Sequence, residues 1–182
     1  RILQSKVYLD EATGLPNKNK CEEILNASES FSEEESIAIC VFDLNNLRNI
    51  NNNLGHDKGD EYIRSFAIQL RIAVADEYFV GRDGGDEFIA VLKNVTRAQV
   101  EQCLQDIREQ TTRYSKEYPE MPISYAVGYA MSQDFEAPTM RELFRYADKN
   151  MYIDKNRAKM EEAAEEKRLN QRLLAKVKEM GY

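Results

Sequence analysis

The sequence predicts an α+β (α/β) sandwich: a mainly antiparallel central sheet with a ferredoxin-like, palm-like core, flanked by helices and followed by a long C-terminal helix. Three observations support this fold class. A continuous apolar run over 37–42 contains β-branched residues and indicates a strand buried on both faces. Two more apolar runs flank a Gly-rich turn at 81–87, as in a β-hairpin. Capping boxes begin at Thr96 and Thr139 and predict helices there.

The first half of the chain alternates loops, helices and the central strand. Residues 1–8 are expected to end a helix that enters from upstream, and the Gly and Pro content of 10–17 predicts a loop. A helix over 18–28, the strand ending at Asp43 and a short helix over 46–53 follow. A longer helix then opens within 55–60, because apolar residues recur at helical spacing after it: Ile63, Phe66, Ala67, Leu70 and Val74.

The second half begins with the predicted hairpin over 77–92. Its second strand is expected to be central, because apolar side chains occupy both of its faces: Ile89 and Val91 on one, Phe88, Ala90 and Leu92 on the other. A helix to about 116, a strand over 122–131 and the last helix complete the order. Helices between antiparallel strands in this order fit a ferredoxin-like core with an added helix.

Composition narrows the class of protein. The chain has 182 residues, 42% hydrophobic and 31% charged, as in one globular domain. Its formal net charge of −7 argues against a nucleic-acid-binding surface. One histidine and three scattered cysteines favour neither a zinc site nor a disulfide framework, and they fit a reducing cytoplasm.

The ends of the chain carry two expectations. No apolar run approaches the ~20 residues of a membrane span. The chain begins with Arg1, so we expect a piece of a longer protein, with any membrane anchor or sensor domain upstream. At the other end Leu169, Leu173 and Val177 form a narrow apolar stripe that is expected to pack on the domain or on a partner. Acidic residues are as prominent as basic ones there, which disfavours direct membrane contact.

The hairpin turn carries two adjacent carboxylates, Asp86 and Glu87, directly after Gly84 and Gly85. The glycines are expected to supply the positive φ angles of a tight turn and to leave room for a phosphate. In a ferredoxin-like sheet the end of the first strand, Asp43, would adjoin Asp86. That pair suits Mg²⁺, whose shell is completed by phosphates and water, and two ions could serve phosphoryl transfer. The alternatives are a solvated acidic turn and two unrelated surface acids.

The stretch Gly84-Gly85-Asp86-Glu87-Phe88 resembles the signature of the GGDEF family, the diguanylate cyclases, and the resemblance runs from about Asp10 to Lys159. It implies a division of the chain into the end of an upstream linker helix (1–9), a GGDEF domain (10–160) and an amphipathic helical extension (161–182). It also implies a fold like the one that the pattern predicts.

The same resemblance implies roles for single residues. Asp43 matches the metal-binding Asp, Leu44 would offer its backbone carbonyl, and Arg48 replaces a phosphate-facing Lys. Asn51 and Asp60 match the residues that hold the guanine edge. A carboxylate can accept from guanine N1–H and the exocyclic amine together, a donor pair that adenine lacks. For Asn51 an ordinary helix-surface position is the alternative, and His56 is expected to be a structural packing or capping residue.

The last helix resembles the family over Tyr146 to Lys155. Lys155 matches the phosphate-binding Lys, and Lys159 follows one turn later on the same face, where the family often has Arg. As bare sequence, two lysines on a charged helix would be a solvated face. Asn45 and Asn52 replace common family aspartates, which leaves the rate in doubt.

The resemblance implies an enzyme that joins two GTP molecules into cyclic di-GMP, using Mg²⁺ or Mn²⁺. Asp86 or Glu87 would help to deprotonate the attacking hydroxyl, and two domains, each holding one GTP, would face each other in a homodimer under an upstream regulator. The alternative is a weak or silent domain that binds GTP or a protein. Many relatives carry an Arg-x-x-Asp product-inhibition site, and here Ala75 and Tyr78 stand at its ends. We therefore expect this chain to lack that site, and Asp60 disfavours a mixed guanine–adenine product.

Overall fold

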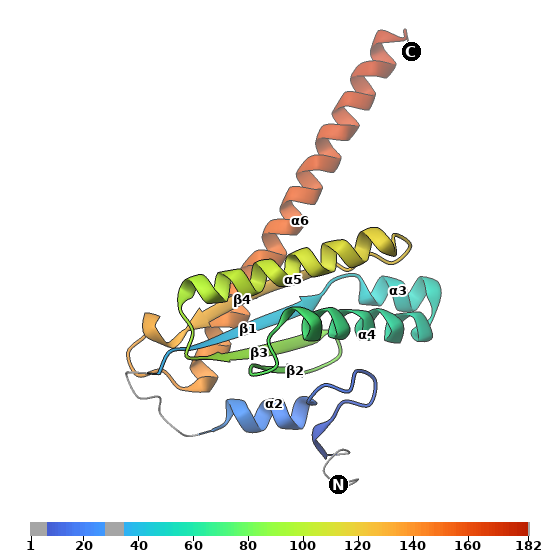
Figure 1. Cartoon of the computed structure of the whole chain (residues 1–182). Helices are drawn as coiled ribbons and strands as arrows, with labels where there is room; N and C mark the ends of the chain where they lie inside the picture. Colours follow the sequence, from blue (N-terminus) through green and yellow to red (C-terminus); the bar gives the residue numbers. More distant parts are fainter. Residues whose placement is uncertain (1–6, 28–34, 182) are drawn as a thin grey trace.

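One antiparallel sheet forms the centre of the computed structural model, which describes residues 7–27 and 35–181. Its strands are β1 (Ile37–Leu44), β2 (Phe79–Arg82), β3 (Glu87–Lys93) and β4 (Tyr125–Met131). They lie in the order β2-β3-β1-β4, and β1 pairs antiparallel with both β3 and β4 (Figure 1). This is the strand order of a ferredoxin-like sheet, so the predicted fold class is confirmed.

Helices cover both faces of the sheet and make a three-layer structure (Figure 1). One face packs against α4 (His56–Ala73) and α5 (Arg97–Glu117), with α3 (Leu47–Leu54) beside α4. The other face packs against α2 (Lys18–Leu25) and the first turns of α6 (Met140–Glu179). The side chains of β3 alternate between the two cores, as predicted: Phe88, Ala90 and Leu92 join the first, and Ile89 and Val91 the second.

The helix starts and strand limits follow local hydrogen bonds. Both predicted capping boxes form, at Thr96 for α5 and at Thr139 for α6. The predicted capping role of His56 is wrong, because the residue is exposed and α4 has Gly55 as its N-cap without a side-chain bond. β4 begins at Tyr125 and not at Pro122, because the backbone N–H of Ile123 donates to Ser115 Oγ (2.9 Å) on α5 and not to a strand.

The segment that leads into the domain is fastened to the hairpin. Residues 1–6 of the predicted upstream helix lie outside the described part of the chain, as does residue 28 at the predicted end of the first full helix. Val7 and Tyr8 are helical, and Leu9 then bridges to Pro16 across the predicted loop. Within that loop Asp10 binds Arg82 at the end of β2, with Nη1 3.1 Å from Oδ2. The loop and the hairpin turn are therefore one connected unit.

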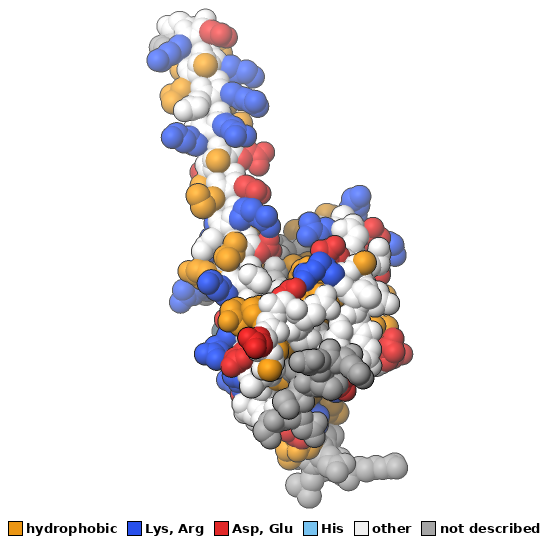
Figure 2. All heavy atoms as spheres, turned by 90° about the vertical axis from the view of Figure 1, so that its left-hand side faces the viewer, with side chains coloured by type: hydrophobic (Ala, Val, Ile, Leu, Met, Phe, Trp, Pro, Cys, Tyr) orange, Lys and Arg blue, Asp and Glu red, His pale blue; other side chains and the backbone are white. Residues whose placement is uncertain are grey.

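The C-terminal part of α6 leaves the body of the protein (Figures 1 and 2). Every side chain from Asn156 to Glu179 is exposed, so the expected packing of Leu169, Leu173 and Val177 on the domain is wrong, and a partner remains a prediction. Figure 2 shows acidic side chains midway along this projection and basic ones farther out. α6 crosses the predicted boundary at 160 without a break, so that boundary also stays a prediction. No helix among the described residues is long and apolar enough to cross a membrane.

Candidate functional site

The ends of β1 and β3 bring the predicted acidic residues together. Asp43 is paired in register with Glu87, and the backbone N–H of Leu44 donates to the carbonyl oxygen of Asp86 (2.8 Å). Asp43 therefore adjoins Asp86 as expected, although the residue directly opposite Asp43 in the ladder is Glu87. β3 starts at Glu87 because its carbonyl accepts the N–H of Asp83 (2.8 Å) and closes the turn there.

Negative charge is concentrated at these strand ends. Burial and the neighbouring carboxylates of Asp83 and Asp148 raise the pKa of Glu87 to about 8. Burial first, and then the charge of Asp43, raise the pKa values of Asp86 and Asp148. Partly buried carboxylates with raised pKa values form a site that a nearby cation would stabilise.

A lysine of α6 supplies part of that positive charge. Lys155 Nζ lies 2.8 Å from Asp43 Oδ2, and both side chains are largely buried. The other oxygen, Asp43 Oδ1, is buried without a hydrogen-bond partner among the described residues. A buried carboxylate oxygen with no donor is costly, so this atom is suited to a cation.

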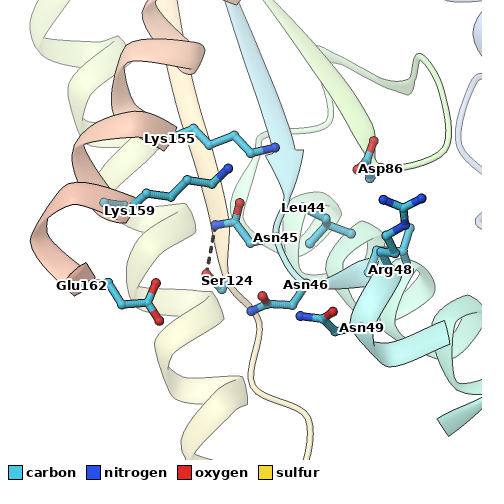
Figure 3. A pocket seen from close by; sticks show the side chains of 12 residues that line it. Leu44, Asn45, Asn46, Arg48, Asn49, Asp86, Ser124, Lys155, Lys159 and Glu162 are labelled. Atoms are coloured by element: carbon cyan, nitrogen blue, oxygen red, sulfur yellow. Dashed lines mark hydrogen bonds between the residues drawn. The ribbon is translucent and has the colours of Figure 1, made fainter. Parts of the chain in front are cut away.

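A cavity of about 700 Å³ opens beside these acids, a size typical of small-molecule sites (Figure 3). Lys155 and Lys159 reach into it from α6, and Arg48 and Asp86 lie on the opposite side. Five of the predicted site residues line it: Leu44, Arg48, Asp86, Lys155 and Lys159. The other residues that line it are Asn45, Asn46, Leu47, Asn49, Ser124, Ala158 and Glu162.

The predicted guanine-binding pair lies outside the lining of this cavity, where α3 meets α4. A Cβ atom on Gly59 would lie 1.7 Å from Asn51 Oδ1, so only glycine allows the Asn51 amide to rest on the first turn of α4. Asp60 follows Gly59 directly and is exposed, and Asn51 is half-buried. The fold therefore places the Asn51 side chain against the residue that precedes Asp60, although Asn51 and Asp60 are nine positions apart in the chain.

The two glycines of the turn act differently from the prediction. Neither Gly84 nor Gly85 has a φ in the left-handed region, so their expected positive φ angles are wrong. A Cβ atom at either would meet nothing within 4 Å, which leaves open space beside the acids. Arg82 holds the turn instead: its Nη2 donates to the Gly85 carbonyl (2.8 Å) and its Nε to that of Gly84 (3.1 Å).

The donor set can hold a divalent cation together with a phosphate ligand. No three His, Cys, Asp or Glu side chains in the described ranges converge on a metal-binding position. Mg²⁺ is commonly held by one or two carboxylates with the rest of its shell from substrate phosphates and water. Asp43 with Asp86 or Glu87, and the Leu44 carbonyl, match that requirement.

Sequence reasoning missed several residues of this region. Asp148 lies seven residues before Lys155, and thus on the same face of α6, a spacing that could have identified it. Gly59 lies in the first turn of a predicted helix although glycine has a low helix propensity, and this could have indicated a close contact there. No sequence signal marks Ser124 or Asp83, because their approach depends on the loops that the sheet brings together.

Comparison with known proteins identifies the family. The family model described as "Diguanylate cyclase, GGDEF domain" matches residues 7–161. The chain belongs to the GGDEF family. The sequence resemblance is therefore confirmed, over most of the chain.

Similar proteins include membrane proteins of unknown activity. One, from Staphylococcus saprophyticus, is 30% identical over 155 residues, which cover 81% of this chain and 43% of that protein. Another, from Staphylococcus aureus, is 27% identical over 157 residues, which cover 82% of this chain and 44% of that protein. Both are named uncharacterized membrane proteins, and the GGDEF chain spans less than half the length of each.

Solved structures share the fold. The GGDEF domain of DgcB from Caulobacter crescentus, solved in complex with c-di-GMP, superposes with a TM-score of 0.70 at 22% identity, covering 82% of this chain and 90% of that one. The diguanylate cyclase SiaD of Pseudomonas aeruginosa, in complex with its activator SiaC, gives 0.69 at 20% identity and coverages of 85% and 61%.

Proposed function

We propose that this GGDEF domain is a diguanylate cyclase that condenses two GTP molecules into cyclic di-GMP and pyrophosphate. The observation that carries the proposal is the arrangement of charge around one cavity. Asp43, with one buried oxygen that has no hydrogen-bond partner in the described part of the chain, lies against the acidic turn of Asp86 and Glu87, and Lys155 and Lys159 reach into the adjoining space. Acids that need a cation beside lysines that need an anion suit a metal-bound phosphate ester.

Each group has a defined task in this proposal. Lys155, Lys159 and Arg48 would hold the phosphates, and Gly84 and Gly85 would leave them room. Asp43, Asp86 or Glu87 and the Leu44 carbonyl would hold Mg²⁺ or Mn²⁺. When bound, the divalent ion supplies charge neutralisation at the phosphate and favours ionisation of the attacking hydroxyl. Lys155 would then leave Asp43 and move to the phosphates, since its ammonium group and the cation would compete for the same carboxylate.

The base is recognised at the other end of the site. Asp60 would accept from guanine N1–H and the exocyclic amine, and Asn51 would both donate and accept at the guanine edge. Adenine would leave the Asp60 carboxylate without those donors, a loss that gives strong discrimination.

Two domains are required for the reaction. One cavity holds one GTP, so two copies must face each other to bring each 3′-hydroxyl to the other nucleotide's α-phosphorus. Asp86 or Glu87 accepts the hydroxyl proton, the new oxygen–phosphorus bond forms, and the bond to the β-phosphate oxygen breaks to release pyrophosphate. An upstream sensor segment would govern this pairing. We place the domain in the cytoplasm with its substrate, and because the relatives are named membrane proteins, a membrane anchor would belong to a segment outside this sequence.

A specific observation also favours a second candidate, a weak or silent module that binds GTP or a protein. Asn45 replaces a common family carboxylate, and its Nδ2 donates to Ser124 Oγ (3.0 Å), so it adds no negative charge to the site. The two functions are separated by incubating concentrated protein with GTP and Mg²⁺ and identifying the products by mass. Cyclic di-GMP is the expected product. Tight GTP binding without any cyclic product would instead establish the silent module.

A further inference from the structure

Tyr62 of α4 connects two loops that line the cavity. Its side chain is fully buried. The phenol oxygen lies 2.8 Å from the carbonyl oxygen of Asn45 and 3.2 Å from both the carbonyl oxygen and the backbone nitrogen of Ser124. Asn45 follows β1 and Ser124 precedes β4, so one hydroxyl contacts both of the loops that extend from neighbouring strands into the site.

These contacts belong to a small network in the cavity wall. The backbone N–H of Asn45 donates to the Ser124 carbonyl (2.9 Å), and its side-chain amide donates to Ser124 Oγ (3.0 Å), as Figure 3 shows. A tyrosine hydroxyl can donate one hydrogen bond and accept others, which suits a donation to Asn45 and an acceptance from the Ser124 N–H. Burial raises the pKa of Tyr62, so the hydroxyl keeps its proton at neutral pH.

Within residues 7–27 and 35–181, the Tyr62 hydroxyl has no hydrogen-bond partner in the hydrophobic core, so core packing does not explain this oxygen. Phe66, one turn along α4, and Ile63, the next residue, fill the same core without any polar side-chain atom. A phenylalanine at 62 would fill the same volume, because only the oxygen would be lost. Among the described residues, the hydrogen-bond partners of this oxygen all belong to Asn45 and Ser124, two residues that line the cavity.

We propose that Tyr62 is a positioning residue for the cyclase reaction, an inference that rests on the proposed function. By fixing Asn45 and Ser124 to α4, it holds the neighbouring Leu44 carbonyl and the phosphate end of the cavity at a set distance from Asp60, two residues away on the same helix. The part of the site that binds the metal and the phosphates is thereby kept at the distance from the guanine-binding part that one GTP molecule spans. Tyr62 itself touches neither substrate nor cation.

Tyr62→Phe tests this proposal, and Tyr114→Phe is its matched control. Tyr114 donates to Ser65 Oγ (2.9 Å) where α4 meets α5, and it does not line the cavity. Tyr114→Phe loses one hydroxyl hydrogen bond and should lower Tm by about 2–4 °C, and Tyr62→Phe, which loses the bonds to both Asn45 and Ser124, should lower Tm further. Only Tyr62→Phe should lower kcat, by about tenfold, with a smaller change in KM, because small displacements of reacting groups are costly. The Mg²⁺ concentration for half-maximal activity should also rise about tenfold.

Equal kinetic constants and equal Mg²⁺ dependence in the two variants would overturn the proposal, since a purely structural hydroxyl changes Tm alone. If Tyr62→Phe does not fold, Ser124→Ala decides: it removes the Oγ link between the same loops, and an unchanged kcat counts against the positioning role. If the unmodified protein makes no cyclic di-GMP, the proposed function fails separately. Calorimetric titration with a non-hydrolysable GTP analogue and Mg²⁺ then decides the inference, because weaker binding by Tyr62→Phe than by Tyr114→Phe supports it and equal affinity refutes it.

Discussion

The two ends of the candidate site are built in opposite ways. At the phosphate end, Asp43 and Glu87 are held on neighbouring central strands, and burial, followed by repulsion from nearby carboxylates, raises the pKa of Glu87 to about 8. At the base end, Asp60 stands exposed on the first turns of α4 beside a half-buried Asn51. The first end is assembled by the fold at an electrostatic cost that a cation would relieve, whereas the second end is open to solvent.

This contrast predicts which substitutions should change activity or binding without lowering the stability of the fold. Removing a carboxylate from the phosphate end removes a group that opposes folding but is required for chemistry. Removing Asp60 should leave folding unchanged and weaken recognition alone. A site in which both ends responded alike to substitution would contradict the comparison.

The largest expected effect is that of Asp43→Asn. The variant loses the charge that would hold the cation, so turnover should fall at least about 1,000-fold, as when a catalytic metal ligand is lost. Its Tm should not fall greatly, because the repulsion from Glu87 and Asp148 is relieved while the contact with Lys155 becomes a weaker hydrogen bond. Product analysis by mass and thermal unfolding measure the two quantities.

Asp76→Asn is the control for that experiment, because Asp76 is a fully exposed acid remote from the cavity lining and should leave turnover unchanged. Substantial cyclic di-GMP production by folded Asp43→Asn would remove Asp43 from the proposed cation site.

The second effect concerns the base end. Asp60→Ala should weaken GTP binding by about 10- to 100-fold, the equivalent of a lost charge-assisted hydrogen-bond pair, with Tm within about 1 °C of the unmodified protein. Calorimetric titration with a non-hydrolysable GTP analogue measures the affinity. The control is Asp57→Ala, an exposed acid in the first turn of the same helix. Equal affinities of the two variants would mean that Asp60 is only a residue at the start of a helix.

The sequence predicted the strands better than the contacts between their ends. Alternating apolar residues in β3 determine its faces, and those faces are as expected. The one-residue register of Asp43 against Glu87 was not predictable, because backbone bonds from Arg82 to Pro16 and from Asp83 to Glu87 set where β3 begins. The first bond joins segments that are distant in the chain, the second lies within the turn itself, and neither leaves a periodic signal.

The site residues also fall into two groups: those that a sequence motif identified and those that come together only in the folded protein. Those found from the sequence, such as Arg48 and Lys155, lie in motifs that the family resemblance made visible. Tyr62 and Ser124 are 62 positions apart and meet only because β4 lies beside β1. The free projection of α6 was missed for another reason: an amphipathic stripe shows which face would pack, but not whether the same chain supplies the surface that covers it.

The third prediction concerns the pH dependence of the free energy of unfolding. It depends on the ion pair between Asp10 in the entering loop and Arg82 beside the acidic turn. Burial opposes ionisation of Asp10, but hydrogen bonds from Thr13 and Arg82 outweigh it and lower the pKa of Asp10. The folded state therefore keeps this carboxyl ionised to a lower pH than the unfolded chain does. Its stabilisation is fully present above about pH 4 and is lost as the pH falls through the lowered value.

Asp10→Asn should therefore lose about 1 kcal/mol at pH 7 and show a smaller fall in stability than the unmodified protein between about pH 4 and pH 2. Urea unfolding across that range measures it, with Glu11→Gln, an exposed neighbour, as the control. Parallel pH profiles for Asp10→Asn and the unmodified protein would show that the pair with Arg82 does not stabilise the loop.

The smallest expected effect is that of added cyclic di-GMP on the initial rate, which should hardly change. The positions that would hold a second cyclic di-GMP are Ala75 and Tyr78, and exposed acids, Asp76 and Glu77, lie between them. Ala75 offers no charge to a phosphate, and the acids repel it, whereas an Arg at 75 and an Asp at 78 could clamp phosphate and guanine. Initial rates should therefore change less than about twofold over the micromolar range of added cyclic di-GMP.

The double variant Ala75→Arg, Tyr78→Asp provides the positive control, because it should gain inhibition that added GTP does not relieve. Ala75 is exposed and Tyr78 only half-buried, so both substitutions can be made without opening the core. Varying GTP at fixed product separates competition in the cavity from binding at this distant surface. Strong non-competitive inhibition of the unmodified protein would reveal a product site elsewhere, and inhibition that persists in Asp60→Ala would place that site outside the base end.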